Sequence, residues 1–332
     1  MTEPIPLSIL DLAAVGREET IAESFAGSVA LAQTAERRGY KRVWYAEHHN
    51  ITSIASSATA VLIAHVAAQT ETIRLGAGGV MLPNHSPLVI AEQFGTLETL
   101  HPGRIDLGLG RAPGTDQRTW MALRRDPAAS DRFPEDVLEL QKFLSDEEPL
   151  PGLRAIPGRG AKVPLYILGS SLFGAELAAQ LGLPYAFASH FAPRHLHEAI
   201  RVYRDGFKPS AQLGEPYVIA GVGVIAADSA ESAAAQLEVA RRVRARAVLG
   251  RGRKLTDEDV TALLASPEAG LVDEMLAYTA VGASDEVTAY LRSFAADTGA
   301  DELIAAHYSD TVPNRLRSVE LTPGTLEPAA AS

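Results

Sequence analysis

The strongest constraint on the fold is a regular alternation of apolar strand-like segments with amphipathic helix-like segments along the 332 residues. Helical patterns fill the intervals, such as 24–38, which Gly39 closes as a typical C-cap. Such alternation predicts a parallel sheet, and eight units predict a closed (β/α)8 TIM barrel of the α/β class, with an open doubly wound sheet as the alternative. The eight predicted strands are 6–13, 42–49, 73–83, 104–112, 164–171, 185–191, 217–228 and 301–308.

Residues 1–325 are interpreted as a single barrel domain, with a helical insertion at about 240–283 and a flexible tail at 326–332. The basic stretch RRVRARAVLGRGRK (241–254) is interpreted as a solvated helix face rather than a binding patch. A segment at 145–162, rich in Pro, Gly and charge, is predicted to be a long loop.

Charge and composition exclude several classes of function. The 41 acidic and 30 basic side chains give a net charge of −11, which argues against nucleic-acid binding and attachment to an anionic membrane. An anionic ligand therefore needs a local group of donors. The absence of cysteine excludes disulfides, thiolate metal sites and cysteine nucleophiles, and fits a cytoplasmic protein. Acidic residues at the N-terminus and the lack of any apolar run of about 18 residues predict neither a signal peptide nor a membrane span.

Polar residues follow most of the predicted strands, at the end of the barrel where active sites of this fold lie. The densest group is EHHN, from Glu47 to Asn50. Such side chains are costly to bury unless paired, so they indicate either a site or an ion-pair network. We expect a ring of polar residues around the barrel mouth. The remaining members are Asp11, Gly78, Gly79, Asn84, Arg111, Gly169, Ser170, Ser171, His190 and His307.

A metal centre is one interpretation of these residues, because His and carboxylate side chains are common ligands. Adjacent strand residues point to opposite faces, however, so His48 and His49 cannot easily hold one ion, and no metal site is predicted. An isolated histidine is otherwise an ordinary hydrogen-bonded residue. We prefer that interpretation for His65 and His101.

Two turns of small residues each have a functional and a structural interpretation. Gly78 and Gly79 allow either close approach of a ligand to the backbone or a simple bulge or tight turn. Ser170 and Ser171 precede a helix, whose free amides could bind an anion together with the two hydroxyls and Arg111. In the alternative, Ser171 is a plain N-cap.

Three separated motifs, in this order, resemble the bacterial luciferase-like family of flavin-dependent monooxygenases. They are WYAEHHN (44–50), the segment 75–114, and LGSSLFGAELAAQLGLPYAFASHFAP (168–193). The likeness covers nearly the whole chain, apart from about 115–160 and 240–283.

The resemblance implies roles for particular residues. His48 would lie beside the flavin and assist its reaction with oxygen and substrate; Glu47 would orient this region or be buried in an ion pair. A non-proline cis peptide at Gly78–Gly79 would support the flavin ring. Arg111, the turn Gly169, Ser170 and Ser171, and the Gly174 amide would hold the flavin phosphate and ribityl chain. This chain departs from the light-emitting subunit in having Gly110 in place of a reactive cysteine, and Gly174 in place of a phosphate-binding hydroxyl residue.

The resemblance also implies the reaction. Reduced FMN, supplied by a separate reductase, would react with O2 and oxygenate a small organic substrate through a flavin hydroperoxide, in a cytoplasmic homodimer. The alternatives are a deazaflavin-dependent hydride transfer, a non-catalytic flavin-binding protein and a metal-dependent barrel hydrolase. Substrate specificity is expected in the loops at 112–133 and 250–283, acting as a lid.

Overall fold

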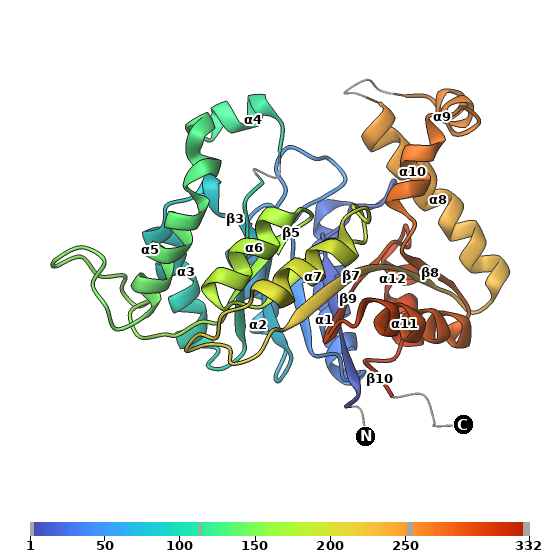
Figure 1. Ribbon diagram of the computed structural model, residues 1–332. Coiled ribbons are helices and arrows are strands. Elements are labelled where there is room, and N and C mark those ends of the chain that lie inside the picture. The colour runs from blue at the N-terminus through green and yellow to red at the C-terminus, as the bar shows by residue number, and fades with distance from the viewer. Residues whose placement is uncertain (1–2, 113–114, 251–254, 328–332) are drawn as a thin grey trace.

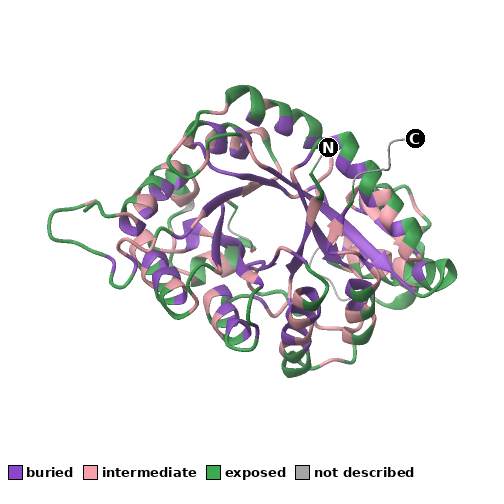
Figure 2. Ribbon diagram, turned by 90° about the horizontal axis from the view of Figure 1, so that it is seen from below, coloured by how far each residue is buried: buried purple, intermediate pink, exposed green. Residues whose placement is uncertain are grey.

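A computed structural model describes residues 3–112, 115–250 and 255–327. Its eight central strands are parallel, and each pairs with the next around a ring. The ring closes because β9 pairs with both β1 and β7 (Figure 2). The prediction of a closed (β/α)8 barrel is confirmed, and the open sheet is excluded. The ring consists of β1 (Ile5–Asp11), β2 (Arg42–Tyr45), β3 (Arg74–Met81), β4 (Ile105–Gly110), β5 (Leu165–Gly169), β6 (Tyr185–Phe187), β7 (Val218–Ala226) and β9 (Glu302–His307).

Helices surround the barrel and bury one face each against it. α1, for example, begins with a capping box between Thr20 and Glu23 and buries a stripe that includes Val29 and Ala32. The other surrounding helices are α2 (Thr59–Ala67), α3 (Pro87–Leu100), α5 (Phe133–Leu144), α6 (Leu172–Leu181), α7 (Leu196–Gly206), α11 (Ser284–Thr298) and α12 (Val312–Leu321), and α1 itself spans Ile21–Arg37. Across the described residues, no helix combines the length and the apolar character needed to cross a membrane.

Several elements differ from the sequence expectations. The region predicted as a helical insertion also contains β8 (Thr279–Gly282), which pairs with the outer part of β7. α2 begins after Ala58, and the Ser56 carbonyl before it accepts a hydrogen bond from the His48 amide in the preceding loop. α12 and the short β10 (Thr325–Leu326) had no clear signal. Leu326 of the predicted tail pairs with Ile5, whereas residues 328–332 lie outside the described residues.

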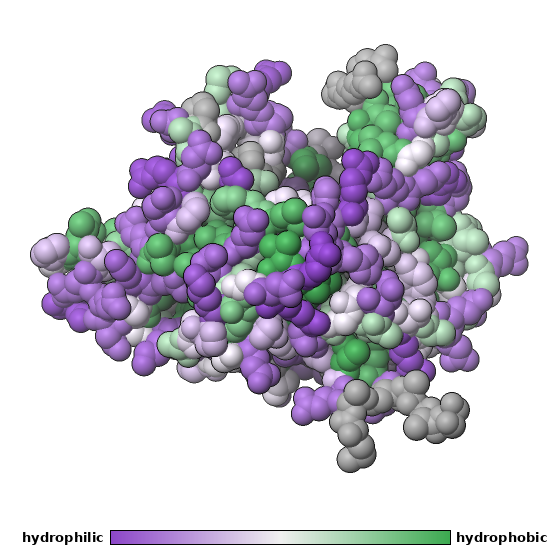
Figure 3. Space-filling model, in the orientation of Figure 1, coloured by the Kyte–Doolittle hydropathy of each residue, from purple (hydrophilic) through white to green (hydrophobic). Residues whose placement is uncertain are grey.

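Two projections rise beside the C-terminal ends of the strands (Figure 1). One contains α4 (Gln117–Ala122) and the 3-10 helix η2 (Pro127–Arg132). The other, here called the α8–α10 arm, contains α8 (Ala230–Leu249), α9 (Asp257–Leu264) and α10 (Ala269–Met275). Figure 3 shows the surface hollowed between them. The described parts of the two loops expected to act as a lid therefore flank the mouth of the barrel, whereas 113–114 and 251–254 lie outside the described residues.

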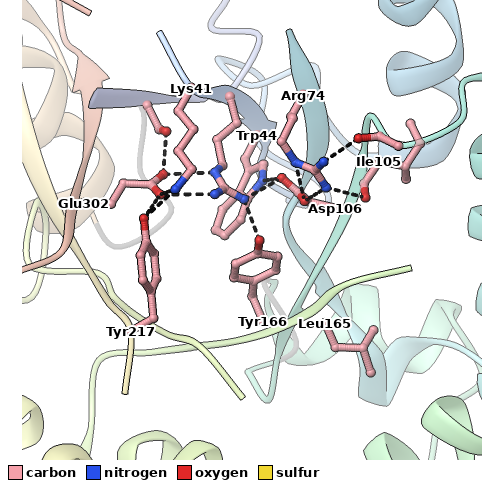
Figure 4. Close-up of polar contacts among 12 residues, drawn as sticks. Lys41, Trp44, Arg74, Ile105, Asp106, Leu165, Tyr166, Tyr217 and Glu302 are labelled. Carbon is pink, nitrogen blue, oxygen red and sulfur yellow. Dashed lines mark hydrogen bonds and ion pairs between the residues drawn. The ribbon is translucent and has the colours of Figure 1, made fainter. Parts of the chain in front are cut away.

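The opposite end of the barrel is filled by buried charges that sequence analysis did not identify. Arg42 lies 2.7 Å from Asp106 and 3.0 Å from Glu302. Each of these carboxylates has a second cation, Arg74 beside Asp106 and Lys41 beside Glu302 (Figure 4). Sharing of this kind compensates charges that would otherwise be costly to bury. An apolar layer above them includes Leu10, Trp44, Tyr166, Ile219 and Ile304.

Candidate active site

Alternate side chains of a strand point to the same face, and Trp44 and Ala46 belong to the apolar layer inside the barrel. His48 follows β2 two residues after Ala46, so it points to the same inner side. Its Nδ1 atom is buried and has no hydrogen-bond partner among the described residues. Burial lowers the pKa of His48 and outweighs the opposing effect of Glu47. A neutral imidazole with one uncommitted ring nitrogen is therefore available at the mouth of the barrel to accept or donate a proton.

Glu47, on the outward side, lies in a buried ion-pair network. Its Oε1 accepts hydrogen bonds from Nε2 of His49 and Nε2 of His85, each at 2.8 Å, and its Oε2 accepts the Met81 amide at 3.1 Å. Burial acts to raise the pKa of Glu47, but the hydrogen bonds from His49 and His85 prevail and the pKa is lowered. The structure thus supports the second interpretation of Glu47, since its carboxylate fastens the end of β2 to the loop after β3. Sequence analysis missed His85 because it lies beyond the strand end.

The Gly78–Gly79 peptide bond is cis, as the resemblance implies. The β3–β4 register shifts between Ala77 and Val80, so the bulge interpretation is also correct. A Cβ atom on Gly78 would lie 2.8 Å from Leu10 Cδ1, and one on Gly79 would lie 2.8 Å from the Gly108 carbonyl oxygen. No side chain fits at either position without displacing a neighbour, so the backbone here is bare.

Arg111 and the start of α6 lie together on the next part of the rim. The Arg111 guanidinium lies 4.2 Å from the ring centroid of Phe173, while its Nε donates to the Ser130 carbonyl at 3.1 Å. Ser171 occupies the N-cap position of α6, yet its side chain makes no capping hydrogen bond within the described part of the chain. The plain N-cap interpretation of its hydroxyl is therefore not supported.

Glycines keep the start of α6 close to the end of β5. A Cβ atom on Gly169 would lie 3.8 Å from the Gly174 Cα, and one on Gly174 would lie 3.3 Å from Tyr185 Cε2. The first amides of α6, the Ser170 and Ser171 hydroxyls and Arg111 form an arrangement suited to an anion.

The ring of polar residues expected from the sequence is only partly correct. The Asp11 carboxylate accepts hydrogen bonds from the Ser28 hydroxyl of α1 and the Ala13 amide. Burial raises the pKa of Asp11 despite these hydrogen bonds. His307 Nδ1 lies 2.7 Å from the Ser318 hydroxyl of α12. Both residues have the outward parity of their strands, so they contact helices rather than the barrel mouth.

His190 does belong to the mouth. A Cβ atom on Gly221, on the inner side of β7, would lie only 2.4 Å from His190 Nδ1, so the imidazole packs directly against this glycine. Burial, with further contributions from Arg244 and His48, lowers the pKa of His190 to about 3. The two imidazoles thus lie near enough to influence each other's protonation, and His190 is neutral. Its neighbours Tyr308 and Arg244 gave no functional signal in the sequence.

Comparison with known proteins agrees with this geometry. The model of the luciferase-like monooxygenase family matches residues 5–302. The chain belongs to this family. A luciferase-like monooxygenase of Escherichia coli K12 is 49% identical over 320 residues, 96% of each chain. N-acetyl-S-alkylcysteine monooxygenase of Bacillus subtilis is 40% identical over 258 residues, 76% of each chain.

Solved structures extend the comparison of this luciferase-like chain. Crystalline apo-MsnO8 matches with a TM-score of 0.86 at 36% identity, covering 96% of this chain and 97% of the other. Two structures at lower identity share the fold alone. The oxygenating constituent of 3,6-diketocamphane monooxygenase from Pseudomonas putida, in complex with FMN, has a TM-score of 0.70 at 18% identity over 96% of both chains. An F420-dependent secondary alcohol dehydrogenase has a TM-score of 0.67 at 15% identity, over 97% and 99%.

As a member of the luciferase-like monooxygenase family, the chain is an oxidoreductase. Within the parts of the chain that the structure describes, no group of three or more His, Asp or Glu side chains is arranged to hold a metal ion.

Proposed function

We propose that the protein is a flavin-dependent monooxygenase that binds reduced FMN at the barrel mouth and uses O2 to oxygenate a small organic substrate. The observation that carries the proposal is the uncommitted, buried Nδ1 of His48 beside the bare backbone of Gly78–Gly79. Tyr45 pairs with Ala77, so the glycine pair, inside β3, and His48, three residues after β2, belong to neighbouring strands of the barrel. This backbone and the imidazole would together hold the flavin ring.

The spread of the candidate residues around the rim supports FMN as the cofactor. Gly78–Gly79 lie within β3, Arg111 directly follows β4, and the turn from Gly169 to Ser171 begins with the last residue of β5, so the three belong to consecutive strands of the barrel. The first of these would hold a flavin ring, and the third its ribityl phosphate. There the Gly174 amide, the two serine hydroxyls and Arg111 would bind the phosphate.

Bound FMN would supply the redox chemistry with O2, and the chain would supply positioning and proton transfer. His48, being neutral, would accept or donate a proton at Nδ1. Glu47 acts as a positioning residue, because it reaches the reacting region only through His49, His85 and the Met81 amide. The projections on either side of the mouth would exclude water from the site.

The substrate class is suggested by one relative. N-acetyl-S-alkylcysteine monooxygenase takes its name from a carboxylate-bearing thioether, and it is 40% identical to this chain. We therefore propose a small anionic organic substrate of comparable size. Hydride transfer with a deazaflavin is the alternative, because an F420-dependent enzyme shares the fold.

The decisive experiment compares cofactors and one histidine. The purified protein is titrated anaerobically with reduced FMN and, separately, with reduced F420, and each complex is then mixed with aerated buffer. We expect tight binding of reduced FMN and a rate of flavin reoxidation that differs from that of free flavin. His48→Ala should still bind FMN but lose this difference, whereas His65→Ala, an exposed histidine of α2, should behave as wild type.

Reoxidation at the rate of free flavin, or failure to bind reduced FMN, would contradict the oxygenase proposal. Selective binding of reduced F420 would favour hydride transfer. Activity that depends on added zinc would favour a metal-dependent hydrolase, and flavin binding without any turnover would favour a storage protein.

We further propose that a separate reductase supplies the reduced FMN and that the protein is a cytoplasmic homodimer. Support for the dimer comes from exposed apolar side chains on neighbouring helices: Val61 on α2 is 70% exposed, and Leu100 on α3 is 62% exposed. Light scattering should give twice the monomer mass. The chain alone should not reduce FMN with NADH or NADPH until a flavin reductase is added.

A further inference from the structure

The basic stretch of α8 contains one arginine that differs from its neighbours. Arg241 lies 2.8 Å from Asp273, and Arg246 forms an ion pair with Asp257. Arg242 donates to the Asp257 carbonyl at 2.9 Å and to the Thr261 hydroxyl at 3.1 Å. These three arginines hold α8 to α9 and α10. They therefore stabilise the arm and do not form a binding patch.

Arg244 instead contacts the barrel. Its guanidinium lies 5.0 Å from the ring centroid of Tyr308. In residues 3–112, 115–250 and 255–327, no carboxylate forms an ion pair with it. The guanidinium of Arg244 is partly exposed, and its N–H donors have no anionic partner in the described part of the chain.

Tyr308 fixes this guanidinium at the mouth. The residue directly follows β9, and its hydroxyl donates to the His190 carbonyl at 2.6 Å. Its ring packs on β7, where a Cβ atom on Gly223 would lie 2.6 Å from Tyr308 Cε2. Arg244 is therefore tied through one side chain to the segment that carries His190, on the inner side of the α8–α10 arm.

The charged or titratable groups that act on His190 at this point are Arg244 and His48. His190 and His48 both have lowered pKa values, and the Arg244 charge contributes to the lowering at His190. The one acid among these groups, Glu47, is committed to His49 and His85. On a chain with a net charge of −11, Arg244 thus supplies a positive charge that no described carboxylate pairs with, which is what binding of an anion requires.

We propose that Arg244 binds the carboxylate of the organic substrate, which makes it a specificity-determining residue of the site. This inference rests on the proposed function and deepens it. The position is distinct from the candidate phosphate site, because β9 lies about half-way round the barrel from β4 and β5, which carry Arg111 and the α6 turn. A single guanidinium fork held on one side by tyrosine matches a carboxylate, whereas the α6 site offers the several amides and hydroxyls that suit a phosphate.

The test compares N-acetyl-S-methylcysteine with its methyl ester, two probes that differ in charge but little in shape. Binding to the full-length protein is measured by calorimetry, with and without reduced FMN under anaerobic conditions. We expect wild type to bind the acid about tenfold or more tightly than the ester, because a hydrogen bond to a charged group is stronger than one to a neutral group. Arg244→Gln should lose this preference, and Arg244→Lys should keep part of it.

Two further variants make the result specific. Arg241→Gln breaks an ion pair of the same helix and should keep the preference for the acid. Arg111→Gln should weaken FMN more than riboflavin and leave the preference between acid and ester unchanged, while Arg244→Gln should bind FMN as wild type does.

An Arg244→Gln protein that still prefers the acid would overturn the proposal, as would a wild type that binds acid and ester equally. Loss of the preference in Arg241→Gln would also overturn it, because the position of the arm and not the Arg244 contact would then be responsible. Failure of wild type to bind reduced FMN would count against the proposed function alone, since the acid and ester are also compared without flavin.

Discussion

Acid should destabilise this protein through the buried imidazole of His307. Burial lowers the pKa of His307 to about 3. In the unfolded chain a histidine takes up its proton near pH 6.5, so below that pH the unfolded state binds one proton more than the folded state. The free energy of unfolding therefore falls as the pH is lowered from about 6.5 toward about 3, by about 1.4 kcal/mol per pH unit. At about pH 5 the loss from this one residue is about 2 kcal/mol.

Local geometry identifies a substitution that removes the titration and keeps the hydrogen bond. The Ser318 hydroxyl accepts the Ala226 amide at 3.0 Å and lies 2.7 Å from His307 Nδ1. An asparagine side chain carries both an acceptor oxygen and a donor nitrogen, so in His307→Asn it can share a hydrogen bond with this hydroxyl in either direction. The variant should be less stable at about pH 8 because it is smaller. Between about pH 7.5 and about pH 5, the free energy of unfolding of the variant should fall by about 2 kcal/mol less than that of wild type.

Urea unfolding followed by circular dichroism at several pH values measures both slopes. His65→Asn, a change of the same kind at an exposed position of α2, serves as the control and should follow the wild-type curve. Parallel pH dependences for wild type and His307→Asn would refute the reasoning, because they would mean that His307 is protonated equally in the folded and unfolded states.

Other substitutions test the barrel and the rim. Arg42→Met should reduce stability by about 3–5 kcal/mol in urea unfolding, because two buried carboxylates lose a shared partner, while Arg246→Met on the exposed arm should cost about 1 kcal/mol or less. Gly108→Ala places a methyl group against the Ala77 carbonyl and Leu168 and should cost about 1–3 kcal/mol or more, whereas Gly214→Ala, with nothing within 4 Å, should be nearly neutral in thermal unfolding. Glu47→Gln should weaken binding of reduced FMN. It should also remove the part of the acid destabilisation that wild type shows as the pH falls below about 4.3, because the lowered pKa of Glu47 stabilises the fold only while the residue is ionised.

The strands of the barrel could be predicted because each is a continuous apolar run between polar turns. β8 could not, since its four residues, Thr279–Gly282, become a strand only by pairing with the outer part of β7. The buried charges at the end of the barrel opposite the mouth could not be predicted either. Arg42, Asp106 and Glu302 are far apart in sequence and meet only when the ring closes.

At the site, motif and strand position located the residues but did not fix their direction. His48 and Glu47 are adjacent, and the parity of β2 sends one to the mouth and the other into an ion pair. The same parity explains why Asp11 and His307 were wrongly expected at the mouth. Arg244 could not be recognised, because its difference from Arg241 and Arg246 lies in the partner that each side chain meets.

The pairing of β8 with β7 has a consequence for how such enzymes diversify. The barrel closes through Ile219 to Val224 of β7 against β9, and β8 pairs only from Gly223 onward. The segment from the end of β7 to β8 therefore begins and ends at the same strand, and it contributes no strand to the closed ring. Such a segment can be exchanged between homologues, by recombination or in a designed chimera, with ring closure intact. A new substrate range could thus be acquired in one genetic step on an unchanged cofactor platform.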